Sequence, residues 1–438
     1  MPLLLAGCSE ELVEPGKMRL VSGHEPDPWT VSPAPVRARV EKERSDGEIV
    51  TIADEPAPIE SFSLGQGAPG RFALTGLDAD EKPRVRARSL LIDPAGFAGG
   101  SLPLFVSRAG ELARPPGELS TEVGASAVAT AVAERYLLLA SGGPGGLFLD
   151  GYDLAAWQPM VPPPALDCGA PSCVPRSLCV VQGSLTLAVG DGWGFWFDPV
   201  AGDSGSIQEP GGLASFADVA GGVTITAPDG SAYLVGGTRP SAPSASVLVV
   251  HADGTLAHLA LTASRQGAAA TWVEGRGLVV VGGGDAKAAG GELLAEGAKA
   301  FTALPLAPDE ARGAALVILD SARLLRLGGE LGSAPAPSVE LSLGCSSSCT
   351  PEPAGDAIEL LRARAFSLGP GRALLVGADQ GGQTRAVRWE AGKAASVELR
   401  DARRDAAAVL LPSGHVGIAG GVLLGAGGAA RSVELYLD

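Results

Sequence analysis

The sequence predicts an all-β protein in which a small β-sandwich precedes seven repeated four-stranded units. Short apolar runs alternate with turn residues along all 438 residues, which include 62 glycines and 34 prolines. One apolar run ending in a glycine pair recurs, most clearly at residues 278–283. Its copies end at Gly143, Gly190, Gly237, Gly283, Gly329, Gly377 and Gly421. These end points lie roughly 43 to 49 residues apart, which is typical of four-stranded repeats.

Composition narrows the possible partners. The formal net charge is −16, and the acidic residues are spread along the chain. A field of this sign repels phosphate backbones, so we expect no nucleic-acid partner. Although 46% of the residues are hydrophobic, no apolar stretch approaches the ~20 residues of a membrane helix. We therefore expect a monomer with a charged surface that meets a membrane only through an anchor.

The first residues contain a possible lipid attachment site. Leu5-Ala6-Gly7-Cys8 resembles a bacterial lipobox, the site at which signal peptidase II cleaves and the cysteine receives its lipid. No basic residue precedes Cys8, and the apolar run is shorter than the 7–15 residues of a signal peptide. We expect residues 1–19 to be a signal remnant and linker, with Cys8 as the mature N-terminus. The alternative is an ordinary cysteine near a flexible end. As a lipoprotein, the chain is expected at an outer membrane or cell surface, in the cell envelope.

Residues 20–100 predict the small sandwich. Five stretches alternate apolar and polar residues and are separated by Pro, Gly and Asp clusters: 36–40, 48–52, 61–64, 71–74 and 85–90. Five or more short strands with polar turns suit a β-sandwich. Residues 70–77 resemble a stretch of immunoglobulin-like or fibronectin-like accessory domains. The arginines here alternate with apolar positions, so we expect them to face water rather than to form an anion site.

Residues 101–438 predict the repeat array. Each copy begins with a hairpin whose second strand is apolar throughout, as in strands buried on both faces. A Cβ at the glycine pair would clash, or forbid a positive φ, where the units converge. Third strands are expected at 338–343, 396–399 and 432–437, and fourth strands at 156–160 and 301–305. The last unit lacks its fourth strand, so we expect residues 102–106 or 111–113 to supply it and close a ring.

Together these features resemble the kelch-repeat β-propeller, the fold shared with the central domain of galactose oxidase. The matching features are the apolar strand with Gly-Gly, the downstream Ser-Val-Glu-Leu, and an aromatic residue followed by Leu-Pro or Met-Val-Pro-Pro. An arginine also recurs before the hairpins, at Arg176, Arg265, Arg312, Arg364 and Arg404. The resemblance covers about three quarters of the chain and implies seven blades. The repeated arginines could form an anion-binding ring, but pairing with carbonyls or acids between blades is favoured.

The six cysteines predict two local disulfides. Cys168 and Cys173 lie in one loop, and Cys345 and Cys349 in another, which suits an exported protein. A zinc site from all four is disfavoured because the loops lie several units apart. Cys179 lies within an apolar strand and is expected to be a buried free thiol.

No catalytic set stands out. The four histidines do not match the copper-ligand pattern of galactose oxidase. A two-residue turn would place His251 and His258 on one strand face, but no third metal ligand accompanies them. The aromatic cluster at 191–196 is either a sugar-stacking platform or, as favoured, packing within a third strand. No nucleophile elbow, phosphate loop or paired-carboxylate motif occurs.

The sequence therefore favours a non-enzymatic scaffold whose propeller binds a protein or glycan, with no cofactor, metal or catalytic residue assigned. The alternative is an enzyme of oxidase or hydrolase type with its site at the channel mouth. The lining of the channel separates the two hypotheses. Converging titratable groups would favour an enzyme, and small residues would favour binding.

Overall fold

The computed structural model describes the chain except residues 1–14, 98, 121–126, 237–242 and 426. The described residues are mostly β-structure, with two 3-10 helices at Pro94–Phe97 and Phe216–Asp218 and no α-helix. The predicted all-β class is thus confirmed. No helix in this part of the chain has the length and apolar character needed to cross a membrane. The chain divides into two compact units, one extending to Ala109 with Leu154–Trp157, the other comprising Gly110–Asp153 and Gln158–Asp438.

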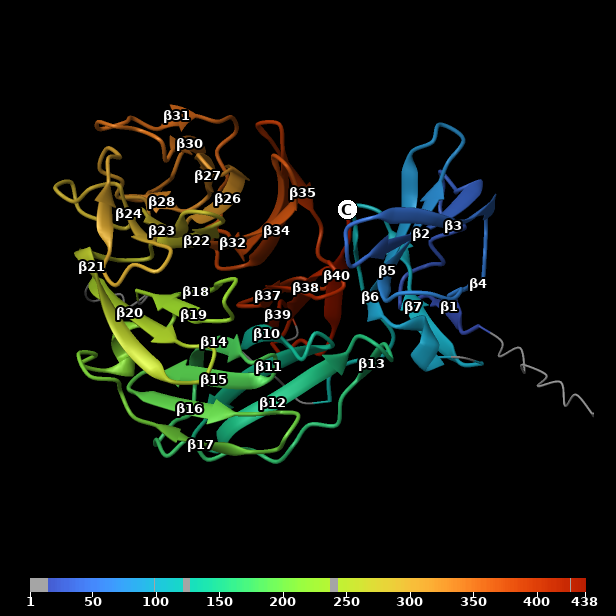
Figure 1. Ribbon diagram of the computed structural model, residues 1–438, viewed down its shortest axis with the longest axis horizontal. Helices are drawn as coiled ribbons and strands as arrows, with labels where there is room; N and C mark the ends of the chain where they lie inside the picture. Colours follow the sequence, from blue (N-terminus) through green and yellow to red (C-terminus); the bar gives the residue numbers. More distant parts are fainter. Residues whose placement is uncertain (1–14, 98, 121–126, 237–242, 426) are drawn as a thin grey trace, which may run out of the picture. The chain divides into compact units, whose positions relative to one another are not determined.

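The first unit contains two sheets (Figure 1). The three-stranded sheet has the order β4 (Ser61–Ser63), β1 (Lys17–Val21), β7 (Ser101–Phe105). The five-stranded sheet has the order β3 (Ile49–Pro56), β2 (Arg37–Arg44), β5 (Gly70–Leu77), β6 (Pro83–Ile92), β8 (Ser107–Arg108). All five stretches expected to be strands lie in these sheets. Both sheets contribute to one buried core, which includes Met18, Leu64, Val40, Phe72 and Val85. Arg37 and Arg39 alternate with buried residues and keep about a third of their side-chain surface exposed, as expected.

The boundary between the units lies beyond the expected residue 100. β7 pairs in parallel with β1, and β8 pairs with β6, so residues 101–108 complete sheets of the first unit. Residues 102–106 therefore do not close the array, which was one of the two expected possibilities. Leu104 and Val106 are buried in the core of the first unit, which explains why this apolar stretch stays with it.

The second unit contains seven four-stranded antiparallel sheets within the described residues. In order of hydrogen bonding they are β10 (Val128–Val132), β11 (Tyr136–Gly143), β12 (Gly146–Asp153), β13 (Gln158–Pro159); β14 (Pro175–Val181), β15 (Leu185–Gly190), β16 (Trp193–Phe197), β17 (Ser204–Ile207); β18 (Val223–Thr226), β19 (Ala232–Val235), β20 (Ser244–Val250), β21 (Leu256–Arg265); β22 (Ala269–Val273), β23 (Gly277–Val281), β24 (Gly291–Ala295), β25 (Thr302–Leu304); β26 (Ala315–Asp320), β27 (Arg323–Leu327), β30 (Val339–Ser342), β31 (Glu352–Pro353); β32 (Leu361–Gly369), β33 (Arg372–Ala378), β34 (Thr384–Glu390), β35 (Lys393–Val397); and β37 (Ala407–Leu410), β38 (Val416–Ala419), β40 (Val433–Tyr436), β9 (Leu112–Ala113). Two small ribbons, β28 (Glu330–Leu331) with β29 (Ala334–Pro335) and β36 (Arg403–Arg404) with β39 (Val422–Leu423), accompany them.

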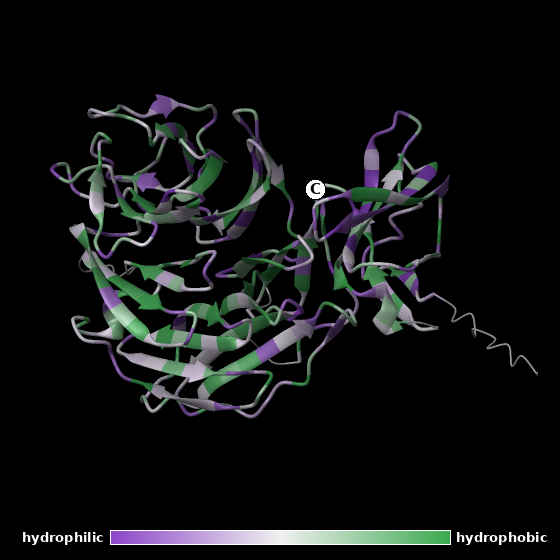
Figure 2. Cartoon of the chain, viewed as in Figure 1, coloured by the Kyte–Doolittle hydropathy of each residue, from purple (hydrophilic) through white to green (hydrophobic). Residues whose placement is uncertain are grey.

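These sheets follow one another around a central axis, the arrangement of a β-propeller (Figure 1). First strands of successive sheets contact each other from β10 through β14, β18, β22 and β26 to β32, and β37 contacts β10. Six clusters of buried apolar side chains each lie between two consecutive sheets. Figure 2 shows the apolar residues concentrated on these strands. The core is therefore a series of layers between sheets.

This layering explains the continuous apolar second strands. In β23, Leu278 and Val280 belong to the cluster shared with the preceding sheet, whereas Val279 and Val281 belong to the cluster shared with the next one. Successive side chains of a strand point to opposite faces, so a strand covered on both faces must be apolar at every position.

The glycine pairs have the geometry that the sequence suggested. Gly283 has φ +64°, and a Cβ there would lie 2.5 Å from the carbonyl oxygen of Gln266. Gly421 has φ +84°, and its Cβ would lie 2.4 Å from the carbonyl oxygen of Arg404. Backbone of the first strand's entry segment thus occupies the space where a side chain would lie. Gly237 falls outside the described residues.

Two strand expectations were resolved by the pairing. Leu112 and Ala113 of β9 pair with Tyr436 and Leu435 of β40, so the second of the two possibilities for ring closure is confirmed. The expected third strand at 396–399 is wrong, because residues 396 and 397 end the fourth strand, β35. A short turn at residues 379–383 joins β33 directly to β34, so the third strand begins earlier than expected.

Candidate functional site

The central channel is the main cavity of the second unit. Its volume is about 540 Å³, within the range of small-molecule sites. The first strands of all seven sheets contribute to its wall: β10, β14, β18, β22, β26, β32 and β37. Because these strands lie side by side around the axis, one inward position per sheet determines what the channel presents.

The channel wall is built mainly from small residues. Of its 34 lining residues, six are glycine and thirteen are alanine. The titratable residues among them are Arg176, Arg362, Arg364 and Asp405. A nucleophile with its base, or a pair of carboxylates, is absent from this described lining, and this leaves no basis for acid–base or covalent chemistry there.

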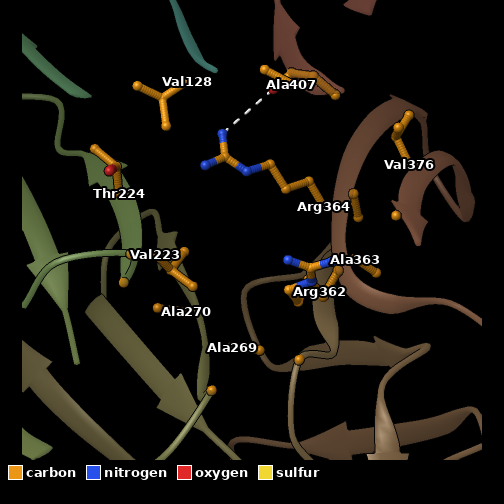
Figure 3. Close-up of a pocket in the computed structure, with 18 of the residues that line it drawn as sticks. Val128, Val223, Thr224, Ala269, Ala270, Arg362, Ala363, Arg364, Val376 and Ala407 are labelled. Carbon is orange, nitrogen blue, oxygen red and sulfur yellow. Dashed lines mark hydrogen bonds between the residues drawn. The ribbon is translucent and has the colours of Figure 1, made fainter. Parts of the chain in front are cut away.

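Arg364 extends into the middle of the channel (Figure 3). It comes from β32, and its Nη1 donates a hydrogen bond of 3.4 Å to the carbonyl oxygen of Ala408 on β37. Val128, Val223 and Thr224 lie around the guanidinium (Figure 3). The side chain is exposed to the channel, yet protein surrounds it, and this desolvation lowers the pKa of Arg364 from its ordinary value. No carboxylate of the described chain forms an ion pair with it, and an arginine still stays charged at neutral pH.

The other two channel arginines have acidic partners. Arg362 Nη2 lies 3.5 Å from Asp405 Oδ1, and Arg176 Nη2 lies 3.3 Å from Asp191 Oδ2. Both pairs are well exposed to water, so each contributes little to stability. Their charges are nevertheless balanced locally, in contrast to that of Arg364.

The recurring arginines therefore have different surroundings and do not form one ring. Arg265 is buried, and its Nε donates to Glu292 at 2.9 Å while Nη1 and Nη2 donate to backbone carbonyls. The matching buried residue in the last sheet is Arg403, which donates to Glu434 at 2.6 Å. Arg404, which the sequence pattern selected, is exposed, and so is Arg312. For Arg265 the structural pairing was the correct alternative.

The cysteines are arranged as predicted. The structure joins Cys168 to Cys173 and Cys345 to Cys349, while Cys179 is a buried thiol. Burial raises the pKa of Cys179 to about 12, so the reactive thiolate is disfavoured. The backbone of each disulfide loop also bonds to the preceding sheet, with Cys173 N donating to Gly143 O and Cys349 N to Pro305 O. Cys8, the expected lipidation site, lies outside the described residues.

The histidine pair differs from the expectation. Leu248 pairs with His258, and His251 N donates to Thr255 O, so the hairpin loop is one residue longer than a two-residue turn. The Asp253 carboxylate stabilises this loop by accepting from Thr255 N at 2.9 Å. The two histidines consequently fall on opposite strand faces. No group of three His, Cys, Asp or Glu residues within the described chain is placed to hold a metal ion.

The aromatic cluster lies within a third strand, β16, as favoured. Trp193, Phe195 and Phe197 are buried and pack in the core between the first two sheets. Side chains held in this way offer no stacking platform for a sugar.

Sequence reasoning named Arg364 only as one of five similar arginines. The stretch Arg362-Ala363-Arg364 places two arginines on the inward face of β32, because alternate residues share a face. At the corresponding strand starts other sheets have Gly267-Ala268-Ala269 and Gly313-Ala314-Ala315. Alignment of the repeats at the strand starts contained this signal.

No family model and no curated protein matches the chain. Among solved structures, a chain of the "Crystal Structure of Mitotic Checkpoint Complex" is similar with a TM-score of 0.47 and 10% identity, over 75% of this chain and 92% of that chain.

Proposed function

We propose that this protein is an exported, lipid-anchored scaffold without enzymatic activity, and that its second unit is a seven-bladed, kelch-like propeller that binds a protein or glycan. The observation that carries the proposal is the channel wall. Its small side chains and three arginines offer contact surface and charge but no set of groups for bond making.

The kelch-like assignment interprets each four-stranded sheet as one blade. Buried arginine–glutamate pairs recur in two of the sheets, and the glycine pair ends the second strand in several of them. The last blade takes its outermost strand from β9, which leaves no unpaired strand edge where the chain ends meet. The first unit, with its two sheets over one core, serves as an immunoglobulin-like accessory domain.

Export is supported by the two disulfides, because such bonds persist in oxidising compartments. The lipobox-like residues 5–8 supply the mode of attachment. In this arrangement a lipid at Cys8 holds the protein at an outer membrane or cell surface, and the propeller faces its partner there.

The rival function is an enzyme with its site at the channel mouth. Only the ion pair of Arg362 with Asp405 favours it, since this pair is the one place in the described channel where an acid and a base converge. An exposed pair of this kind is a common surface feature.

Binding to isolated cell envelopes tests the proposal. Labelled protein should bind saturably, and treatment of the envelopes with protease or with periodate identifies the partner as protein or glycan. The exposed Arg312 and Arg404 lie beside the glycine-pair turns, on the face that we assign to the partner. Arg404→Glu should weaken binding, whereas Arg323→Glu, a half-exposed arginine in the β26–β27 hairpin, should not.

Two outcomes would contradict the proposal. One is the absence of saturable binding to any envelope preparation. The other is turnover of a chromogenic ester, glycoside or oxidase substrate that disappears in the Asp405→Asn variant, since this would place catalysis at the channel mouth.

A further inference from the structure

Arg364 is an uncompensated positive charge inside a chain that carries a net charge of −16. Its printed polar contact is the 3.4 Å hydrogen bond to Ala408 O, which is long for an N–H···O bond. A guanidinium has five N–H donors, so most of those of Arg364 remain available to a molecule in the channel. Acidic residues are abundant in the chain, yet among the described residues none pairs with Arg364.

The surroundings of Arg364 define what could bind it. Val128 and Val223 present apolar surface beside the guanidinium, and Ala269 and Ala270 keep the channel open (Figure 3). Arg362 is two residues away on the same face of β32, about 7 Å along the strand, and Asp405 already balances its charge. A ligand therefore meets one positive charge next to an apolar wall.

We propose that the propeller channel binds a small organic monoanion, of the class of short-chain carboxylates, with its carboxylate on the guanidinium of Arg364 and its apolar tail against Val128 and Val223. A carboxylate matches the guanidinium fork and accepts two parallel hydrogen bonds. A single positive charge selects a monoanion over a dianion, which would retain an unpaired charge within the channel. This site is separate from the proposed partner-binding face, so either assignment can fail without the other.

Isothermal titration calorimetry of the full chain tests this proposal, with butyrate as the probe. Wild-type protein should bind one butyrate saturably, with a dissociation constant on the order of 1 mM for so small a ligand. Sulfate, a dianion, and butylamine, a cation with a similar tail, should bind at least tenfold more weakly. Absence of saturable butyrate binding, or sulfate binding of equal strength, would overturn the proposal.

Substitutions locate the site. Arg364→Gln should weaken butyrate binding at least tenfold, whereas Arg312→Gln, the same change at an exposed arginine outside the channel lining, should leave it unchanged. Arg364→Lys keeps the charge but loses the fork, so binding should persist at reduced strength. It also provides the test if Arg364→Gln does not fold. Unchanged binding in both Arg364 variants would show that butyrate binds elsewhere.

Thermal unfolding separates a ligand site from a structural role. Without butyrate, Arg364→Gln should melt at or above the wild-type temperature, because it removes a charge that has no acidic partner. Butyrate should raise the melting temperature of wild type and not that of the variant. A large loss of stability in the variant, with the butyrate effect retained, would make Arg364 a structural residue.

Discussion

Two buried arginine–glutamate pairs tie neighbouring segments of the propeller together at single residues. Glu292 accepts from Arg265 and also from the backbone of Thr262 and Ala263. Glu434 accepts from Arg403 and from the backbone of Arg400 and Asp401 in the same spacing. The segment before each first strand is thereby fixed to a third strand. The buried charge is stabilised because it is paired and fully hydrogen-bonded.

The first prediction concerns this pair. Arg265→Met leaves the Glu292 carboxylate buried without its cation and should lower the free energy of unfolding by about 3–5 kcal/mol. Arg323→Met, which breaks exposed pairs, should cost about 1 kcal/mol or less. Urea unfolding followed by tryptophan fluorescence measures both. Equal losses in the two variants would show that the buried pair has no special role.

At the scale of elements, the glycine pair turns the chain where the sheets converge. Gly283→Ala introduces both a strained φ of +64° and a Cβ 2.5 Å from Gln266 O. Gly297→Ala has a similar φ of +73° but nothing within 4 Å, so it isolates the backbone strain. We expect about 1–2 kcal/mol for Gly297→Ala and about 2 kcal/mol more for Gly283→Ala. Equal unfolding midpoints would mean that the turn can shift to accommodate a side chain.

The β5–β6 hairpin of the first unit should respond to acid. Asp78 Oδ1 accepts from Lys82 N and Asp80 N at 2.9 Å, and Oδ2 accepts from Arg84 Nε at 2.6 Å. The Lys82 N–H in particular, with Arg84 and Asp80 N, lowers the pKa of Asp78. A lowered pKa in the folded state adds stability above the unfolded value of about 3.9, and this stability is lost as the pH falls through the folded value.

Accordingly, Asp78→Asn should unfold at lower urea than wild type at pH 7, and the difference should narrow toward pH 3. The exposed Asp80 is the control, since Asp80→Asn keeps the backbone N–H that donates to Asp78. A difference that stays constant across this pH range would exclude Asp78 as a contributor to acid sensitivity.

For the whole molecule, ring closure by β9 makes the second unit cooperative. Leu112 is fully buried and packs with Leu374, Val416 and Tyr436 between the last sheets. Leu112→Asp places a charge in this core and should cost about 4 kcal/mol or more, and the freed edge of β40 should promote self-association. Leu331→Asp, at a half-exposed leucine of β28, should do neither. Size-exclusion chromatography and urea unfolding check both, and a monomeric, stable Leu112→Asp protein would contradict closure by β9.

Much of this architecture was predictable because periodicity and turn chemistry are local signals. The hairpins, the apolar second strands and the β9–β40 pairing followed from residues within each repeat. The β20–β21 register did not, because it depends on how Asp253 caps one loop. The third strand of the β32–β35 sheet was missed because its sequence lacks the Ser-Val-Glu-Leu pattern. The position of Arg364 in the channel depends on the closed ring, which single repeats do not reveal.

Intact mass spectrometry of the protein from the membranes of the cells that make it tests most directly whether this propeller is an exported, anchored scaffold. The predicted species begins at Cys8, carries a diacylglyceryl group there, contains two disulfides, and has one free thiol at Cys179. A protein that retains Met1 and carries six reduced cysteines would contradict export and lipid anchoring.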